Sequence, residues 1–372
     1  MKAVLLLEDG RAFEGTSAGT PGTAFGEVVF NTALSGYQET LTDPSYRGQI
    51  VVMTASHVGN YGLNDEDGES SRIQVAGFVA RHFPETFSNP RGKRSIHEAL
   101  SEAGVVGIHG VDTRALVRHL RSGGVLRGAI STAHEGAEGR AALLEAIRAQ
   151  PEMAGAALAL EVGTRVPYAF EPAVHADAAR PRVAAIDYGI KTNILKLLTE
   201  EGFAVTVFPA ETSAATLLDP GAADGRPFAG FFLSNGPGDP AALTGCVQEV
   251  KGLVESGRPV FGICLGHQLL GLAVGASTFK LKFGHRGVNH PVKDVESGAV
   301  SITSQNHGFA VDPTTLPANA ELTHVNLNDG TCEGFRLKDR PVFAVQYHPE
   351  SAPGPHDSSA LFAAFSRDVR QS

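Results

Sequence analysis

Apolar residues in the second half of the chain follow two alternating patterns. Stretches with helical spacing lie at residues 194–198 and 247–254. Short apolar runs flank them at 183–186, 204–208, 231–233 and 259–263. The runs have the length of buried strands, whereas the stretches place their apolar side chains on one helical face. Strands that alternate with helices predict an α/β fold with a doubly wound parallel sheet, in which ligands bind at the carboxyl ends of the strands.

The first half has a different composition and pattern, with short apolar runs among many Gly, Thr and Ser residues. Residues 4–7, 28–30 and 50–53 indicate strands, and a turn signal at residues 8–10 (EDG) follows the first of them. Residues 112–120 indicate an amphipathic helix with an aspartate cap. This half predicts a smaller domain of mixed α+β structure.

The change of pattern sets the predicted domain boundaries. Residues 150–180 are rich in Ala, Glu and Pro and show no clear period, which is typical of a connection. We therefore predict a mixed N-terminal domain over residues 1–150, a linker over 151–180 and the doubly wound domain over 181–372.

Composition narrows the class of protein. Three cysteines in 372 residues, without CxxC spacing, exclude a disulfide framework and argue against a structural zinc site. The net charge is −9 with no basic cluster, so we expect no nucleic-acid partner. No uncharged apolar run reaches 18 residues, and the N-terminal apolar run is too short for a signal peptide. We expect a cytoplasmic protein that does not enter a membrane.

The candidate nucleophile is Cys264, in the sequence G-x-C-x-G at a predicted strand-to-helix junction. This pattern is similar to the nucleophile turn of hydrolases that carry G-x-S-x-G, with sulfur in place of oxygen. The turn is tight, so a Cβ at Gly262 or Gly266 would clash with neighbouring backbone. The helix N-terminus favours a thiolate at this position. The backbone N–H of Leu265 would point toward a developing oxyanion. The alternative is an inert core cysteine beside packing glycines.

The candidate base is His348, which follows the apolar run at residues 342–347. In an extended chain, residues i and i+2 point to the same side, so Glu350 can accept a hydrogen bond from the His348 ring. A cysteine, a histidine and an orienting carboxylate together form a catalytic triad.

A glycine-proline loop, residues 234–240 (SNGPGDP), follows another predicted strand. Gly236, Gly238 and Ala241 match G-x-G-x-x-A, so a nicotinamide-cofactor domain is an alternative. That fingerprint usually closes the first strand–helix unit of its domain, whereas this loop comes later. Its prolines also remove backbone donors that a pyrophosphate would need. We therefore interpret the loop as an oxyanion- or carbonyl-binding segment.

Other cofactor sites find little support in the sequence. No Walker A motif occurs, so any ATP chemistry is expected on another chain. The spacing of His285, His290, His307 and His348 is irregular, and we predict no metal site. Residues 306–309 (NHGF) form a predicted turn for which spacing alone favours a structural role.

The same motifs support a resemblance to a known family. Residues 261–268 (FGICLGHQ), 348–350 (HPE) and the loop at 234–240 resemble class I, triad-type glutamine amidotransferases. Motifs of the first half are similar to the small subunit of carbamoyl phosphate synthetase, as are residues 282–285 and 289–292. These first-half motifs are residues 7–10, 30–32, 36–39, 41–46, 56–60 and 111–114. The similarity covers essentially the whole chain.

The resemblance implies a specific activity. Such a subunit hydrolyses L-glutamine and passes ammonia through an internal channel to a large subunit. The large subunit uses bicarbonate, two ATP and magnesium to make carbamoyl phosphate for arginine and pyrimidine synthesis, so no cofactor is expected on this chain.

The resemblance also implies roles for individual residues. Cys264 is the nucleophile, His348 the acid and base, and Glu350 its orienter, while Leu265 and Gly236 hold the oxyanion through their backbone N–H groups. The residues expected to line the glutamine pocket are Ser45, Gly236, Gly238, Leu265, Gln268, Asn306, Gly308 and Phe309. Two other functions stay open: a free-standing cysteine hydrolase without a partner, and a catalytically silent binding protein.

Overall fold

Two compact units make up the chain. The computed structural model describes residues 1–134, 136–170, 180–219 and 226–372. One unit contains Met1–Ala156 and Lys282–Gly287, and the other contains Ala157–Leu281 and Val288–Ser372. Part of the predicted linker, residues 171–179, lies outside the described residues. The described part of that segment includes a short helix, α5 (Ala159–Val162), and a strand, β8 (Tyr168–Phe170). The predicted boundaries stay a prediction.

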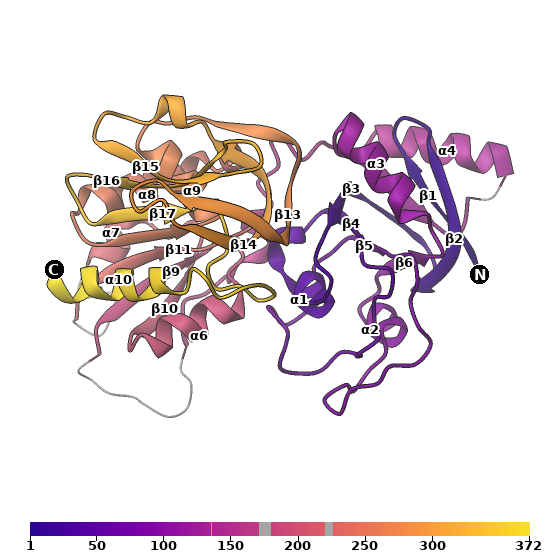
Figure 1. Ribbon diagram of the computed structural model, residues 1–372, viewed down its shortest axis with the longest axis horizontal. Coiled ribbons are helices and arrows are strands. Elements are labelled where there is room, and N and C mark those ends of the chain that lie inside the picture. The colour runs from indigo at the N-terminus through magenta and orange to yellow at the C-terminus, as the bar shows by residue number, and fades with distance from the viewer. Residues whose placement is uncertain (135, 171–179, 220–225) are drawn as a thin grey trace. The chain divides into compact units, whose positions relative to one another are not determined.

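The first unit is built around a closed barrel (Figure 1). Its strands run in the order β1-β2-β6-β5-β4-β3-β7. Their bounds are β1 (Lys2–Leu7), β2 (Ala12–Gly19), β3 (Thr23–Asn31), β4 (Gln49–Met53), β5 (Gly77–Val79), β6 (Val106–His109) and β7 (Leu126–Ser131). The three strands predicted in this half lie within β1, β3 and β4. The sequence pattern did not predict that these strands form a closed barrel. The barrel closes because β7 pairs antiparallel with both β1 and β3.

Short helices complete this unit. They are α1 (Tyr37–Thr42), a 3₁₀ turn at Pro44–Tyr46, α2 (Ile96–Glu102), α3 (Thr113–Gly123) and α4 (Gly136–Arg148). Helix α3 confirms the predicted amphipathic helix. Its N-cap is Asp112, whose carboxylate accepts a hydrogen bond from the Ala115 N–H at 3.0 Å. Leu116 and Leu120 of this helix are buried in the barrel core.

The second unit carries a ten-stranded sheet in the order β14-β13-β15-β16-β17-β12-β11-β9-β10-β8. The parallel part is formed by β9 (Arg182–Asp187), β10 (Ala204–Pro209), β11 (Gly230–Leu233), β12 (Val260–Ile263) and β17 (Val342–Val345). It confirms the predicted doubly wound sheet. The antiparallel extension contains β13 (Thr278–Asp294), β14 (Val300–Val311), β15 (Ala320–Asn326) and β16 (Cys332–Leu337). The sequence pattern did not predict that extension.

Helices cover both faces of the parallel strands (Figure 1). Their bounds are α6 (Thr192–Glu200), α7 (Ala214–Leu218), α8 (Thr244–Glu255), α9 (Leu265–Ala273) and α10 (Ala360–Gln371). Side chains of β9 alternate between two apolar cores. Ala184 and Ile186 join the core with α7, α8 and α9, whereas Val183 and Ala185 join the core with α6 and α10. Burial on both faces explains why these strands read as continuous apolar runs.

No helix in the described part of the chain is both long and apolar enough to cross a membrane.

The cap of α3 gives a first prediction. Replacing Asp112 with Ala should destabilise the first turn by about 1 kcal/mol, because the Ala115 N–H loses its acceptor. Exchange of the α3 amides, measured by mass spectrometry, should then become about fivefold faster. Asp112→Asn keeps an acceptor and serves as the control. Equal exchange in Asp112→Ala and the parent chain would contradict the capping role.

Candidate active site

The candidate nucleophile lies at the junction between β12 and α9. Cys264 has φ 54° and ψ −102°, a backbone conformation that a residue with a side chain rarely adopts. A Cβ on Gly266 would press on the carbonyl of Leu233, and one on Gly262 would come within 2.8 Å of Gly266. The predicted need for both glycines is confirmed. The close approach of β11, β12 and α9 keeps the turn in this conformation.

Strand order brings the other predicted segments to the same edge. β12 pairs in parallel with β11 on one side and β17 on the other, so the chain leaves all three strands at one end of the sheet. The glycine-proline loop follows β11, and the Gly266 N–H donates to the carbonyl of Ser234 in that loop at 2.9 Å. His348 follows β17, where its N–H donates to the Ser304 carbonyl of β14 at 2.9 Å.

His348 and Glu350 form the predicted pair. Nδ1 of His348 lies 2.6 Å from Oε1 of Glu350, and both side chains are buried. Cys264 also interacts electrostatically with His348, whose Nε2 is buried without a hydrogen-bond partner in the described part of the chain. The three residues predicted as a triad therefore lie close together. Pro349 separates the His from the Glu and fixes φ between them, which favours the extended segment that the prediction assumed.

A fourth residue completes this cluster. The Lys191 ammonium donates to the same Oε1 of Glu350 at 2.8 Å, and both side chains are buried. Asn193 donates to the backbone carbonyl of Glu350 at 2.6 Å. The sequence prediction missed both residues. The available signal was a lysine and an asparagine at the start of α6, just beyond the carboxyl end of β9.

Charge compensation sets the protonation states. Burial acts to raise the pKa of Glu350, but Lys191 and then His348 outweigh it, and the pKa is lowered to about 2. Burial acts to lower the pKa of His348, but Glu350 and Cys264 outweigh it, and the pKa is raised to about 10. A carboxylate and an imidazolium are thus favoured at neutral pH. The imidazolium has a proton to give to a leaving group.

The loop and the turn also contact each other. A Cβ at Gly236 would press on the Tyr188 carbonyl and reach the Leu265 side chain. Glycine is therefore required where the loop passes this close to the start of α9. Gly238 has φ 94°, in the region that favours glycine.

Contacts are present for some of the predicted pocket residues of the second unit. The Asn306 carbonyl lies 3.6 Å from Sγ of Cys264. Gln268 donates from Nε2 to the Phe309 carbonyl at 2.8 Å. Gly308 lies between Asn306 and Phe309 on β14. Ser45 belongs to the first unit, where it is buried in the turn at Pro44–Tyr46 and its N–H donates to Asp43. Its place in a glutamine pocket stays a prediction.

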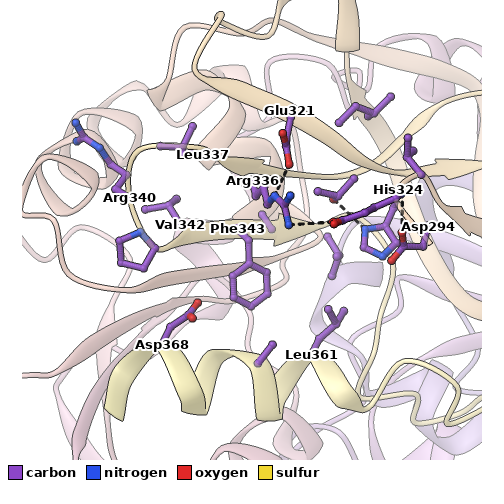
Figure 2. A pocket seen from close by; sticks show the side chains of 18 residues that line it. Asp294, Glu321, His324, Arg336, Leu337, Arg340, Val342, Phe343, Leu361 and Asp368 are labelled. Atoms are coloured by element: carbon purple, nitrogen blue, oxygen red, sulfur yellow. Dashed lines mark hydrogen bonds and ion pairs between the residues drawn. The ribbon is translucent and has the colours of Figure 1, made fainter. Parts of the chain in front are cut away.

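A separate pocket of about 690 Å³ lies elsewhere in the second unit (Figure 2). Strands β15 to β17 and helix α10 supply most of its lining. Phe343 points from β17 toward α10, and Arg336 pairs with Glu321. None of the predicted site residues lines this pocket.

Comparison with known proteins covers nearly the whole chain. Residues 5–130 match the family "Carbamoyl-phosphate synthase small chain, CPSase domain", and residues 184–367 match "Glutamine amidotransferase class-I". The carbamoyl phosphate synthase small chain of Polynucleobacter asymbioticus is 50% identical over 98% of this chain and 94% of its own length. That of Akkermansia muciniphila is 50% identical over 100% and 98%.

One match among solved structures covers less than half of this chain. A glutamine amidotransferase from Thermotoga maritima is 21% identical over 46% of this chain and 76% of its own, with a TM-score of 0.37.

Removing the buried cation tests the fourth member of the cluster. Lys191→Met leaves the Glu350 carboxylate without its largest compensating charge, so we expect a loss of about 3–5 kcal/mol in unfolding free energy. Urea denaturation at neutral pH measures the loss. The matched control is Lys196→Met, on the exposed side of the same helix, which should change stability by less than about 0.5 kcal/mol. Equal effects of the two substitutions would rule out the role assigned to Lys191.

The raised pKa of His348 predicts a dependence of stability on pH. Because the folded pKa lies above the ordinary 6.5, protonated His348 stabilises the fold fully below pH 6.5. This contribution is lost as the pH rises toward about 10. Between pH 6.5 and 10, the parent chain should therefore lose unfolding free energy relative to His348→Gln. Parallel stability curves for the two proteins would contradict the assignment.

Proposed function

Because the chain belongs to the family of carbamoyl phosphate synthase small chains, we propose that its Cys264, His348 and Glu350 hydrolyse glutamine to supply ammonia for carbamoyl phosphate synthesis. The observation that carries this proposal is the 2.6 Å contact of His348 with Glu350 near Cys264, at the carboxyl edge of a parallel sheet. The chain is the glutamine-hydrolysing component of such a synthase.

The proposed reaction has two stages. In the first, the Cys264 sulfur attacks the carboxamide carbon of glutamine, and the C–N bond breaks as His348 gives a proton to the departing ammonia. In the second, His348 takes a proton from water, and the resulting hydroxide cleaves the γ-glutamyl thioester to release glutamate and the Cys264 thiolate, while the proton stays on His348. Glu350 keeps the imidazole oriented in both stages.

Backbone donors would stabilise the intermediate. We propose that the N–H groups of Leu265 and Gly236 hold the oxyanion, since the glycine-proline loop contacts the start of α9. One such donor is typically worth about 3–4 kcal/mol in the transition state.

We further propose a glutamine pocket that surrounds this turn. Its residues would be Ser45, Gly236, Gly238, Leu265, Gln268, Asn306, Gly308 and Phe309. The contacts of Asn306 with Cys264 and of Phe309 with Gln268 support the part that lies in the second unit.

A large subunit is the expected partner, since the relatives of this chain are small chains. We propose that ATP, magnesium and bicarbonate bind that subunit, that ammonia reaches it through a channel, and that the complex acts in the cytoplasm. Enclosed transfer is chemically reasonable because free ammonia is mostly protonated near pH 7 and then is not a nucleophile.

The division of labour can be tested in the complex with the large subunit. Cys264→Ser should lower glutamine-dependent carbamoyl phosphate formation by at least about a thousandfold, while synthesis from added ammonia continues unchanged. Loss of both activities would contradict the separation of the two chemistries. Full glutamine hydrolysis by the isolated chain, without any large partner, would favour a free-standing hydrolase instead.

A further inference from the structure

Both N–H groups of the Gln268 side-chain amide donate hydrogen bonds. Nε2 donates to the Phe309 carbonyl at 2.8 Å and to Oε1 of Gln346 at 3.0 Å. A side-chain amide carries two N–H groups, so these bonds use both. No described residue donates to the remaining atom, Oε1 of Gln268. The amide therefore presents an acceptor and has no donor to offer.

Gln346 is the partner that makes this arrangement specific. It lies directly after β17, two residues before His348, and is fully buried. Its backbone N–H donates to the Glu333 carbonyl of β16 at 2.9 Å, which fixes the main chain at this position. The acceptor for Gln268 is thus held by the sheet.

The other end of Gln346 faces a buried histidine. Gln346 interacts electrostatically with His267, and Nε2 of His267 lies 3.7 Å from Sγ of Cys332. Burial lowers the pKa of His267 to about 3, so the ring is neutral and can accept on its second nitrogen. Nε2 of Gln346 and Nδ1 of His267 are both buried and have no hydrogen-bond partner in the described part of the chain. Among the described residues, the hydrogen bond that Oε1 of Gln346 accepts from Gln268 is therefore the side-chain contact that links the two amides.

The opposite orientation of Gln268 is unfavourable. It would turn the Gln268 oxygen toward the Phe309 carbonyl and Oε1 of Gln346, so that acceptors would face each other without a proton between them. Gln346 and the Phe309 carbonyl distinguish the two orientations because each offers an oxygen to the Gln268 amide.

We propose that Gln346 is a positioning residue that holds the Gln268 amide with Oε1 toward the substrate, where it accepts a hydrogen bond from an N–H group of glutamine. The inference rests on the proposed function and deepens it. It names Oε1 of Gln268 as the atom that recognises glutamine. It also attributes the orientation of that atom to Gln346, which lies outside the predicted site. The donor is either the α-ammonium or the carboxamide of glutamine, since both carry N–H groups.

Binding measurements in a double-mutant cycle test the proposal. In the full chain carrying Cys264→Ala, which prevents turnover, glutamine binding is measured by calorimetry for Gln346→Met, Gln268→Met and the double variant. Met keeps the side-chain length and removes the hydrogen bonds. We expect Gln346→Met to weaken binding about tenfold, and to have no further effect once Gln268 is Met. A matched control is Thr199→Val, which removes a buried hydrogen bond to Leu195 in α6 and should leave the Kd unchanged.

The outcomes separate this inference from the proposed function. An unchanged Kd in Gln346→Met, or losses that multiply in the double variant, would overturn the positioning role while glutamine hydrolysis by the parent chain still stands. Absence of hydrolysis in the parent complex would instead overturn the proposed function, and the binding cycle would still decide the role of Gln346. Glutaramate, which lacks the α-ammonium, identifies the donor. If that group is the donor, replacing glutamine by glutaramate should cost less affinity in Gln268→Met than in the parent background.

Discussion

The catalytic edge of the second unit is organised around one buried carboxylate. Glu350 could not remain ionised in this environment without compensation, because burial opposes its charge. Lys191 and His348 supply that compensation from two different parts of the sheet, one beyond β9 and one beyond β17. The strands between them carry the nucleophile and the glycine-proline loop. The ion pairs therefore link the outer segments of the edge, and the central segments are positioned by backbone contacts.

Local sequence patterns predicted what depends on neighbours in the chain. The strained turn at Cys264 needs small residues on both sides, and the two glycines of G-x-C-x-G are visible in the sequence itself. The i and i+2 relation of His348 and Glu350 is a property of any extended segment. The alternation of strands and helices likewise predicted the parallel sheet, because each helix must return the chain to the start of the next strand.

Contacts between distant segments could not be predicted in this way. Lys191 lies 159 residues from Glu350, and Gln346 lies 78 residues from Gln268. Their pairing depends on strand order, which no single window of sequence contains. The same reason applies to the closed barrel, where β7 must find both β1 and β3, and to the antiparallel strands that bring Asn306 and Phe309 beside α9. A residue such as Gln346 shows no sign of its role until its partners are known.

The pocket of Figure 2 has a practical consequence for the search for small-molecule inhibitors. It offers about 690 Å³, with Phe343 and Arg336 in its lining, yet it includes none of the residues proposed to touch glutamine. A compound chosen to fill this hollow would not occupy the positions proposed to bind glutamine, so glutamine would not compete with it for the same site. Screens that select for competition with substrate would discard such compounds, and screens that detect binding alone would retain them.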